Sequence, residues 1–183
     1  MNTALKVLFS FLTLFLGYLT FRVVVRKDYR SKGKLSNFAT ALEIIIFAVH
    51  GHLTYIFLPA PYPLMPAFPE NMLQRILGIG LLTLGILFTF WAMSGLGFKK
   101  AVGQDTETLN RTGFYRFTRN PQLIFYGVAL LGIAILWFDV FALVWIFVYA
   151  AIAHMMVTTE EEHLLSIYGD DYQKYCEEVP RYL

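Results

Sequence analysis

Four long apolar stretches limit what this chain can fold into. They cover residues 7–25, 38–58, 76–98 and 123–157, and the third contains no charged residue. A helix needs about 20 mostly apolar residues to cross the roughly 30 Å hydrocarbon core of a bilayer. Across the chain 57% of the residues are hydrophobic and 15% are charged, against about 25% charged in a typical soluble domain. The sequence therefore predicts an all-α integral membrane protein.

The last apolar stretch is too long for one span. As a single helix, residues 123–157 would be about 52 Å long. The segment "WFDVF" around Asp139 supplies a turn, so the stretch divides into spans at 123–138 and 140–157. We predict one membrane domain, 1–183, with five transmembrane helices, the last two a helical hairpin, and a cytosolic C-terminal helical tail.

The distribution of charge predicts the orientation. Three loops are expected between the first four spans: residues 26–34 are strongly basic, residues 59–71 contain no Lys or Arg, and residues 99–119 are basic again. Because cytoplasmic loops are enriched in Lys and Arg, the N-terminus is expected outside and the C-terminus in the cytosol. Basic residues also follow the first apolar run instead of preceding it, unlike a cleavable signal peptide. A net charge of +2 gives no support for nucleic-acid binding.

Two polar motifs flank the predicted hairpin on its cytosolic side. The first is "LNRTGFYRFTRNPQ", residues 109–122, and the second is "TTEEEHLLSIYGDDYQKY", residues 158–175. Each has a simple structural explanation. In the first, Pro121 can open a helix; in the second, Thr159 and Glu162 fit a capping box with Thr159 as the N-cap. Together, however, they place many groups suited to a charged small molecule on one membrane face.

These motifs, followed by "VPRYL", resemble the isoprenylcysteine carboxyl methyltransferase and phospholipid methyltransferase superfamily over residues 109–183. The resemblance implies an S-adenosylmethionine-dependent enzyme whose lipophilic or small membrane-partitioning acceptor enters from the bilayer. It assigns catalytic roles to Arg119, Glu160 and Glu161. The implied cofactor-binding residues are Gly113, Tyr115, Arg119, Asn120, Pro121, Glu160, Glu161, Leu164, Tyr172 and Tyr175.

The expected substrate contacts are Glu43, His154 and Met156. Carboxyl methyltransferases of this superfamily carry an arginine where Met156 stands, so a carboxylate acceptor is disfavoured. Glu43 is an acid inside a predicted span, and such acids usually have a function. The sequence leaves open which acceptor is methylated and whether its nitrogen, oxygen or sulfur receives the methyl group.

Two alternatives remain at this stage. The first is an NADPH-dependent sterol double-bond reductase, because the tail "YGDDYQKYC" is also similar to that class of enzyme. The second is a non-catalytic membrane scaffold, in which the acids of the tail would serve only to begin a helix. The segment "HGH" at His50 to His52 lacks a nearby third ligand, so no metal is expected. The single cysteine, Cys176, excludes an internal disulfide.

Overall fold

The computed structural model describes residues 3–60, 64–97, 100 and 109–183, and these residues contain helices but no strand. The elements are α1 (Thr3–Tyr18), the π-helical segment η1 (Leu19–Val25), α2 (Arg26–Lys32), α3 (Asn37–Leu53), the 3₁₀ segment η2 (Thr54–Phe57), α4 (Met72–Leu96), the 3₁₀ segment η3 (Gly113–Arg116), α6 (Pro121–Leu136), α7 (Val140–Tyr168) and α8 (Asp170–Glu178).

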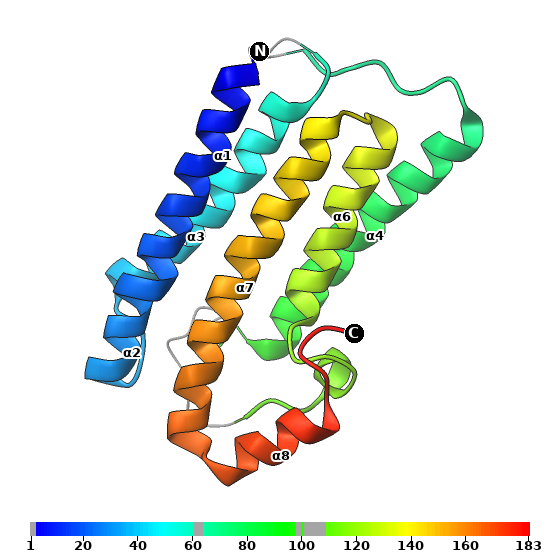
Figure 1. Cartoon of the computed structure of the whole chain (residues 1–183). Coiled ribbons are helices and arrows are strands. Elements are labelled where there is room, and N and C mark those ends of the chain that lie inside the picture. The colour runs from blue at the N-terminus through cyan, green and yellow to red at the C-terminus, as the bar shows by residue number, and fades with distance from the viewer. Residues whose placement is uncertain (1–2, 61–63, 98–99, 101–108) are drawn as a thin grey trace.

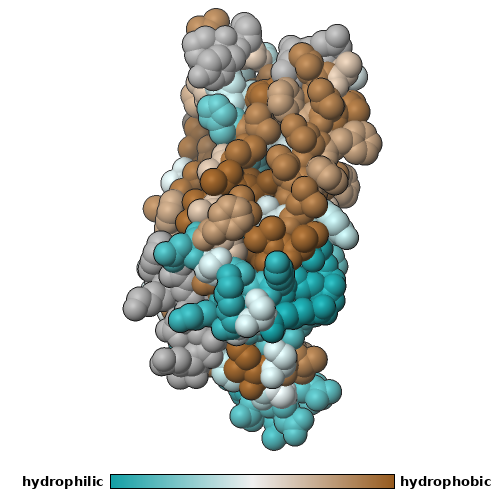
Figure 2. Space-filling model, turned by 90° about the vertical axis from the view of Figure 1, so that its left-hand side faces the viewer, coloured by the Kyte–Doolittle hydropathy of each residue, from teal (hydrophilic) through white to brown (hydrophobic). Residues whose placement is uncertain are grey.

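Four helices in the described part of the chain are long and apolar enough to cross a membrane. They are Thr3–Lys32, Asn37–Phe57, Met72–Leu96 and Val140–Tyr168; α6 is apolar but has only 16 residues. The all-helical membrane fold is thus supported, while the count of five spans stays a prediction. In Figure 1, α7 lies between α1 and α3 on one side and α6 and α4 on the other. Figure 2 shows apolar residues over the upper part and a band of hydrophilic residues below it.

The basic segment expected to be a loop is helical as far as Lys32, so that expectation is wrong. Residues 26–32 continue the first helix through η1 without a Pro or Gly to stop it. The helix ends at Gly33, whose φ of 68° lies in the left-handed region that glycine tolerates. The acid Asp28 accepts hydrogen bonds from Lys32 and from the backbone N–H of Ser36, which anchors the turn into α3.

The simple explanation of the second motif, a capping box with Thr159 as the N-cap, is also wrong. Helix α7 begins after Asp139, whose side chain accepts a hydrogen bond from the Phe141 N–H at 2.7 Å, and runs for 29 residues. Thr159 is buried within it and donates to the Met155 carbonyl at 2.8 Å. At about 43 Å, α7 is longer than the hydrocarbon core is thick. The acids therefore lie on the protruding end of a span and do not begin a new helix.

Helices α4 and α6 approach so closely that their backbones touch, and this is the most extensive helix pair. A Cβ added to Gly85 would lie 2.5 Å from the Ala129 nitrogen, and one added to Gly132 would lie 2.5 Å from the Leu82 nitrogen. Small residues at such positions permit tight packing between membrane helices. The Thr89 hydroxyl of α4 also donates to the Gln122 carbonyl at 3.4 Å, so the contact extends to the first turn of α6, which begins at Pro121.

Helix α3 is joined to α7 by an aromatic stack. The imidazole of His50 is fully buried and lies 4.5 Å from the Trp145 ring, which in turn stacks on Phe57 at 4.4 Å. The Trp145 Nε1–H donates to the His50 carbonyl at 3.3 Å and to the Thr54 hydroxyl at 3.0 Å. His50 is therefore a core residue of the α3–α7 contact. No group of three His, Cys, Asp or Glu side chains suited to a metal occurs among the described residues.

Candidate functional site

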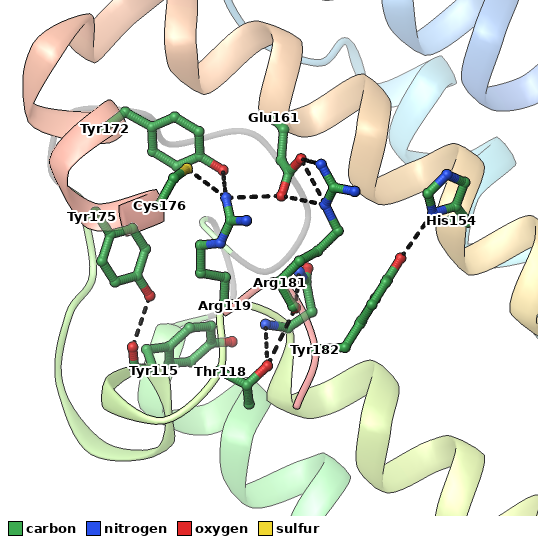
Figure 3. Close-up of polar contacts among 11 residues, drawn as sticks. Tyr115, Thr118, Arg119, His154, Glu161, Tyr172, Tyr175, Cys176, Arg181 and Tyr182 are labelled. Atoms are coloured by element: carbon green, nitrogen blue, oxygen red, sulfur yellow. Dashed lines mark hydrogen bonds and ion pairs between the residues drawn. The ribbon is translucent and has the colours of Figure 1, made fainter. Parts of the chain in front are cut away.

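The segment before α6 and the end of α7 meet through an ion pair. The Arg119 Nη1 lies 2.9 Å from the Glu161 Oε1, and the two side chains are 10% and 14% exposed. The same nitrogen donates to the Tyr172 hydroxyl at 3.2 Å and contacts the Cys176 sulfur (Figure 3). The two polar motifs thus form one site, although Arg119 and Glu161 are 42 residues apart in the sequence.

Helix α8 completes this site because it is amphipathic. Tyr172, Tyr175 and Val179 are spaced three and four residues apart, so they share one face, and this face is buried on Leu109 and Leu164. The Tyr175 hydroxyl donates to the Tyr115 carbonyl at 2.7 Å, which ties α8 to η3 (Figure 3).

The last residues of the chain fold back over Arg119. The Arg119 N–H donates to the Pro180 carbonyl at 3.0 Å, and the Asn120 amide donates to the Arg181 carbonyl at 3.0 Å. The Arg181 guanidinium binds Glu161 through Nε at 3.0 Å and Nη2 at 2.7 Å. Arg181 was not predicted as a site residue, although it belongs to the "VPRYL" segment. It shares Glu161 with Arg119, as Figure 3 shows.

A cavity of about 80 Å³ lies between these segments. Eight of the ten residues expected to bind the cofactor line it: Tyr115, Arg119, Asn120, Glu160, Glu161, Leu164, Tyr172 and Tyr175. The other two, Gly113 and Pro121, do not line it. Gly113 has a φ of 59° and begins η3, and Pro121 is buried in the first turn of α6. Both shape the backbone that presents Arg119.

Sequence reasoning missed several residues of the same cavity. Among them are Tyr29, Leu96, Gln122 and His163. Gln122 is the last residue of the first motif, and its side-chain oxygen accepts a hydrogen bond from the Tyr115 hydroxyl at 3.0 Å. Its place in the motif was a usable signal. Nothing in the sequence indicated Tyr29, which is 90 residues away from Arg119.

Burial controls the protonation of the tyrosines in this site. It raises the pKa of Tyr175 to about 12, and burial together with Glu161 raises the pKa of Tyr172 far above its usual range. Both hydroxyls are therefore neutral near pH 7 and serve as hydrogen-bonding groups. The hydrogen bond to Glu161 raises the pKa of Arg181, which keeps that guanidinium charged.

One donor of the site lacks a partner. The Arg119 Nε is buried and has no hydrogen-bond acceptor among the described residues. Leaving such a donor unpaired costs about 1–3 kcal/mol. A bound molecule with an acceptor oxygen would remove this cost.

A second cavity adjoins the first inside the apolar part of the molecule. It encloses about 440 Å³ between α3, α4, α6 and α7, and shares Leu96 and Gln122 with the first cavity. Helices α3 and α4 are not among the closely packed pairs, so they flank this cavity without closing on each other. Most of its lining is apolar, and the exceptions include Glu43, which is 8% exposed.

The three residues expected to contact substrate separate into two groups. Glu43 and Met156 line the second cavity. His154 lines neither cavity: it is exposed and lies 3.2 Å from the Tyr182 hydroxyl (Figure 3).

Comparison with known proteins gives one match. A family model described as phospholipid methyltransferase matches residues 73–171, more than half of the chain. The match includes α4, the first motif, the α6–α7 pair and the paired acids, but not Glu43, the tyrosines of α8 or Arg181. No curated protein and no solved structure matches the chain.

Proposed function

Because this chain belongs to the phospholipid methyltransferase family, whose members are membrane methyltransferases, we propose that it transfers a methyl group from S-adenosylmethionine to a lipophilic acceptor. The observation that carries this proposal is the pair of adjoining cavities, one polar and one apolar, with Leu96 and Gln122 as a common wall. Methyl transfer requires the donor and acceptor to be held in line at short distance. Two cavities that meet at one wall suit this requirement.

The residues of the polar cavity fit S-adenosylmethionine, which would supply the activated methyl group. The unpaired Arg119 Nε is a donor for its carboxylate. The rings of Tyr115 and Tyr172 offer π faces for a cation such as a sulfonium. Glu160 lines the cavity and makes no hydrogen bond with another described residue, so it can accept one from a hydroxyl or amino group.

The size of the polar cavity adds one condition. About 80 Å³ is well below the roughly 300 Å³ at the lower end of ordinary ligand pockets. The walls must therefore move apart on binding. A neighbouring crevice of about 440 Å³ lies beside Arg119, Glu161 and Tyr172, which line both spaces. A shift of these side chains would join them.

The apolar cavity suits an acceptor that arrives from the lipid. Its lining contains no Lys or Arg among the described residues, so it offers no charge partner for a carboxylate. Glu43 is 8% exposed and lines this cavity, and a carboxylate there favours an acceptor group that donates hydrogen bonds. We propose that the membrane face with both motifs is cytosolic, in agreement with the basic segments beside it.

Family membership favours methyl transfer over NADPH-dependent reduction and over a non-catalytic scaffold. The binding test uses the full chain purified in mild detergent. S-adenosylhomocysteine is expected to bind, measured by titration calorimetry, and Glu160→Gln to weaken this binding about tenfold or more, as for loss of a charge-assisted hydrogen bond. Glu177→Gln, on the exposed side of α8, is the matched control and should bind like the native protein. Selective binding of NADPH would support the reductase instead, and no binding of either would support the scaffold.

The acceptor is tested separately. Transfer of a labelled methyl group into membrane lipid extract should fall in Glu43→Gln while affinity for S-adenosylhomocysteine is unchanged, because Glu43 lines only the apolar cavity of the two. Unchanged transfer would remove Glu43 from the acceptor site.

A further inference from the structure

A fourth space lies on the other side of α7, between this helix and α2. It is a crevice of about 460 Å³. The rings of Tyr29 and His163 stack with centroids 3.9 Å apart and line both this crevice and the polar cavity, so the stack is a wall common to the two. Neither proposed cavity for methyl transfer contains the basic residues of this crevice.

The crevice carries an excess of positive charge. Arg26 and Arg30 line it together with one acid, Glu162. The Arg26 Nε donates to the Glu162 Oε2 at 2.7 Å, and Arg22 lies 3.0 Å from the other oxygen of this carboxylate. One negative charge is thus shared between two guanidinium groups. Arg30 makes no ion pair or hydrogen bond with another residue in the described ranges, so its charge is uncompensated there.

A buried nitrogen in the same wall lacks a partner. His163 is 5% exposed, and its Nε2 makes no hydrogen bond within the described part of the chain. Buried polar atoms are nearly always paired, and an exception calls for a partner such as a ligand or water. This observation is independent of the arginines and points to a polar ligand in a space that His163 lines, which the crevice and the polar cavity both are.

The apolar surface next to the crevice indicates the kind of molecule that carries this ligand group. Leu19 and Val23 are 36% and 47% exposed and precede Arg26 by about two turns and one turn, respectively. Leu165, which lines the crevice, is 49% exposed. A molecule with acyl chains along Leu19 and Val23 therefore brings its headgroup to the arginines. Inorganic phosphate would use only the polar half of this surface.

We infer that the crevice between α2 and α7 binds the phosphate group of an anionic membrane lipid. The planar guanidinium matches the geometry of phosphate oxygens, and basic residues just outside a membrane span attract anionic lipids. This inference does not depend on the proposed methyl transfer, since Arg26 and Arg30 line neither of the two cavities of that proposal.

The test is lipid binding by the full chain. Retention of phosphatidylglycerol is compared with that of phosphatidylcholine by native mass spectrometry, and inorganic phosphate is titrated as a soluble competitor. Arg30→Gln is expected to weaken phosphatidylglycerol binding about tenfold or more, as for a lost hydrogen bond to a charged group. The matched control is Lys27→Gln, which removes the same charge from an exposed position of α2 outside the crevice. It should weaken binding by about fivefold or less, the effect of general surface charge.

Three outcomes of these measurements test whether the crevice binds an anionic lipid. A preference for phosphatidylglycerol that Arg30→Gln abolishes and Lys27→Gln leaves largely intact supports the inference. Equal effects of the two substitutions, or equal retention of both lipids, would overturn it. Displacement by inorganic phosphate without a preference between lipids would assign the crevice to a soluble phosphate and overturn the lipid assignment. Binding of S-adenosylhomocysteine, measured in parallel, should be unchanged in Arg30→Gln.

Discussion

The Arg119–Glu161 ion pair is the contact on which the candidate site depends most, and its energy can be estimated. Its side chains are 10% and 14% exposed, so solvent screens the pair weakly. Removing one partner of a buried pair typically costs about 3–5 kcal/mol, because the other charge is left buried. The Arg181–Glu161 pair provides an internal comparison. The Arg181 side chain is 41% exposed, and pairs at exposed positions contribute about 0.2–1 kcal/mol.

A double-mutant cycle separates the two contacts. The variants are Arg119→Gln, Glu161→Gln and the double substitution, with a second cycle that uses Arg181→Gln in place of Arg119→Gln. Stability is measured by equilibrium unfolding in mixed micelles with increasing denaturing detergent. We expect a coupling energy of at least about 1.5 kcal/mol for Arg119–Glu161 and less than about 1 kcal/mol for Arg181–Glu161.

The difference between the cycles tests the reasoning directly. If the Arg119–Glu161 coupling is below about 0.5 kcal/mol, the two motifs do not meet in the folded protein and the candidate site is wrong. Equal couplings would show that burial does not distinguish the two arginines.

Three further predictions use the same unfolding measurement. Gly85→Ala and Gly132→Ala should each destabilise the protein by about 1–3 kcal/mol through overpacking, whereas Gly80→Ala should be neutral or slightly stabilising, since its added Cβ meets nothing within 4 Å. Burial raises the pKa of Tyr175 to about 12, against about 10 in the unfolded chain. The contribution of the neutral Tyr175 to the free energy of unfolding is therefore complete below about pH 10 and is lost as the pH rises through about 12. The variant Tyr175→Phe should lose less stability between these pH values than the native protein, and an identical pH profile would contradict the assignment. Trp145→Ala should cost about 3–5 kcal/mol, as for other buried aromatic residues, and a cost below about 1 kcal/mol would show that its stacked core position does not exist.

Sequence patterns recovered much of the candidate site because its residues lie in two short motifs. Eight of the ten expected cofactor residues line one cavity. The spacing within α8 predicts a shared face for Tyr172 and Tyr175, since residues three apart are neighbours on a helix. Their roles in binding stay predictions.

The errors arose where a local pattern competed with continuation of a helix. The pattern around Thr159 fits an N-cap, but α7 passes through it because no Pro or Gly interrupts the backbone hydrogen bonds before Gly169. The basic composition after residue 25 predicts a loop, but the helix continues to Lys32 because a high density of charge marks a membrane boundary without ending a helix.

By itself the sequence determined that the chain is helical and apolar enough for a membrane, and that two polar motifs flank the last apolar block. Both properties follow from hydrophobicity and spacing along the chain. Only the tertiary structure decided that Arg181 shares Glu161 with Arg119, that Tyr29 enters the same cavity, and that Glu43 faces a different one. These contacts join residues far apart in sequence, so they depend on how closely the helices pack, and one chain read alone does not contain that information.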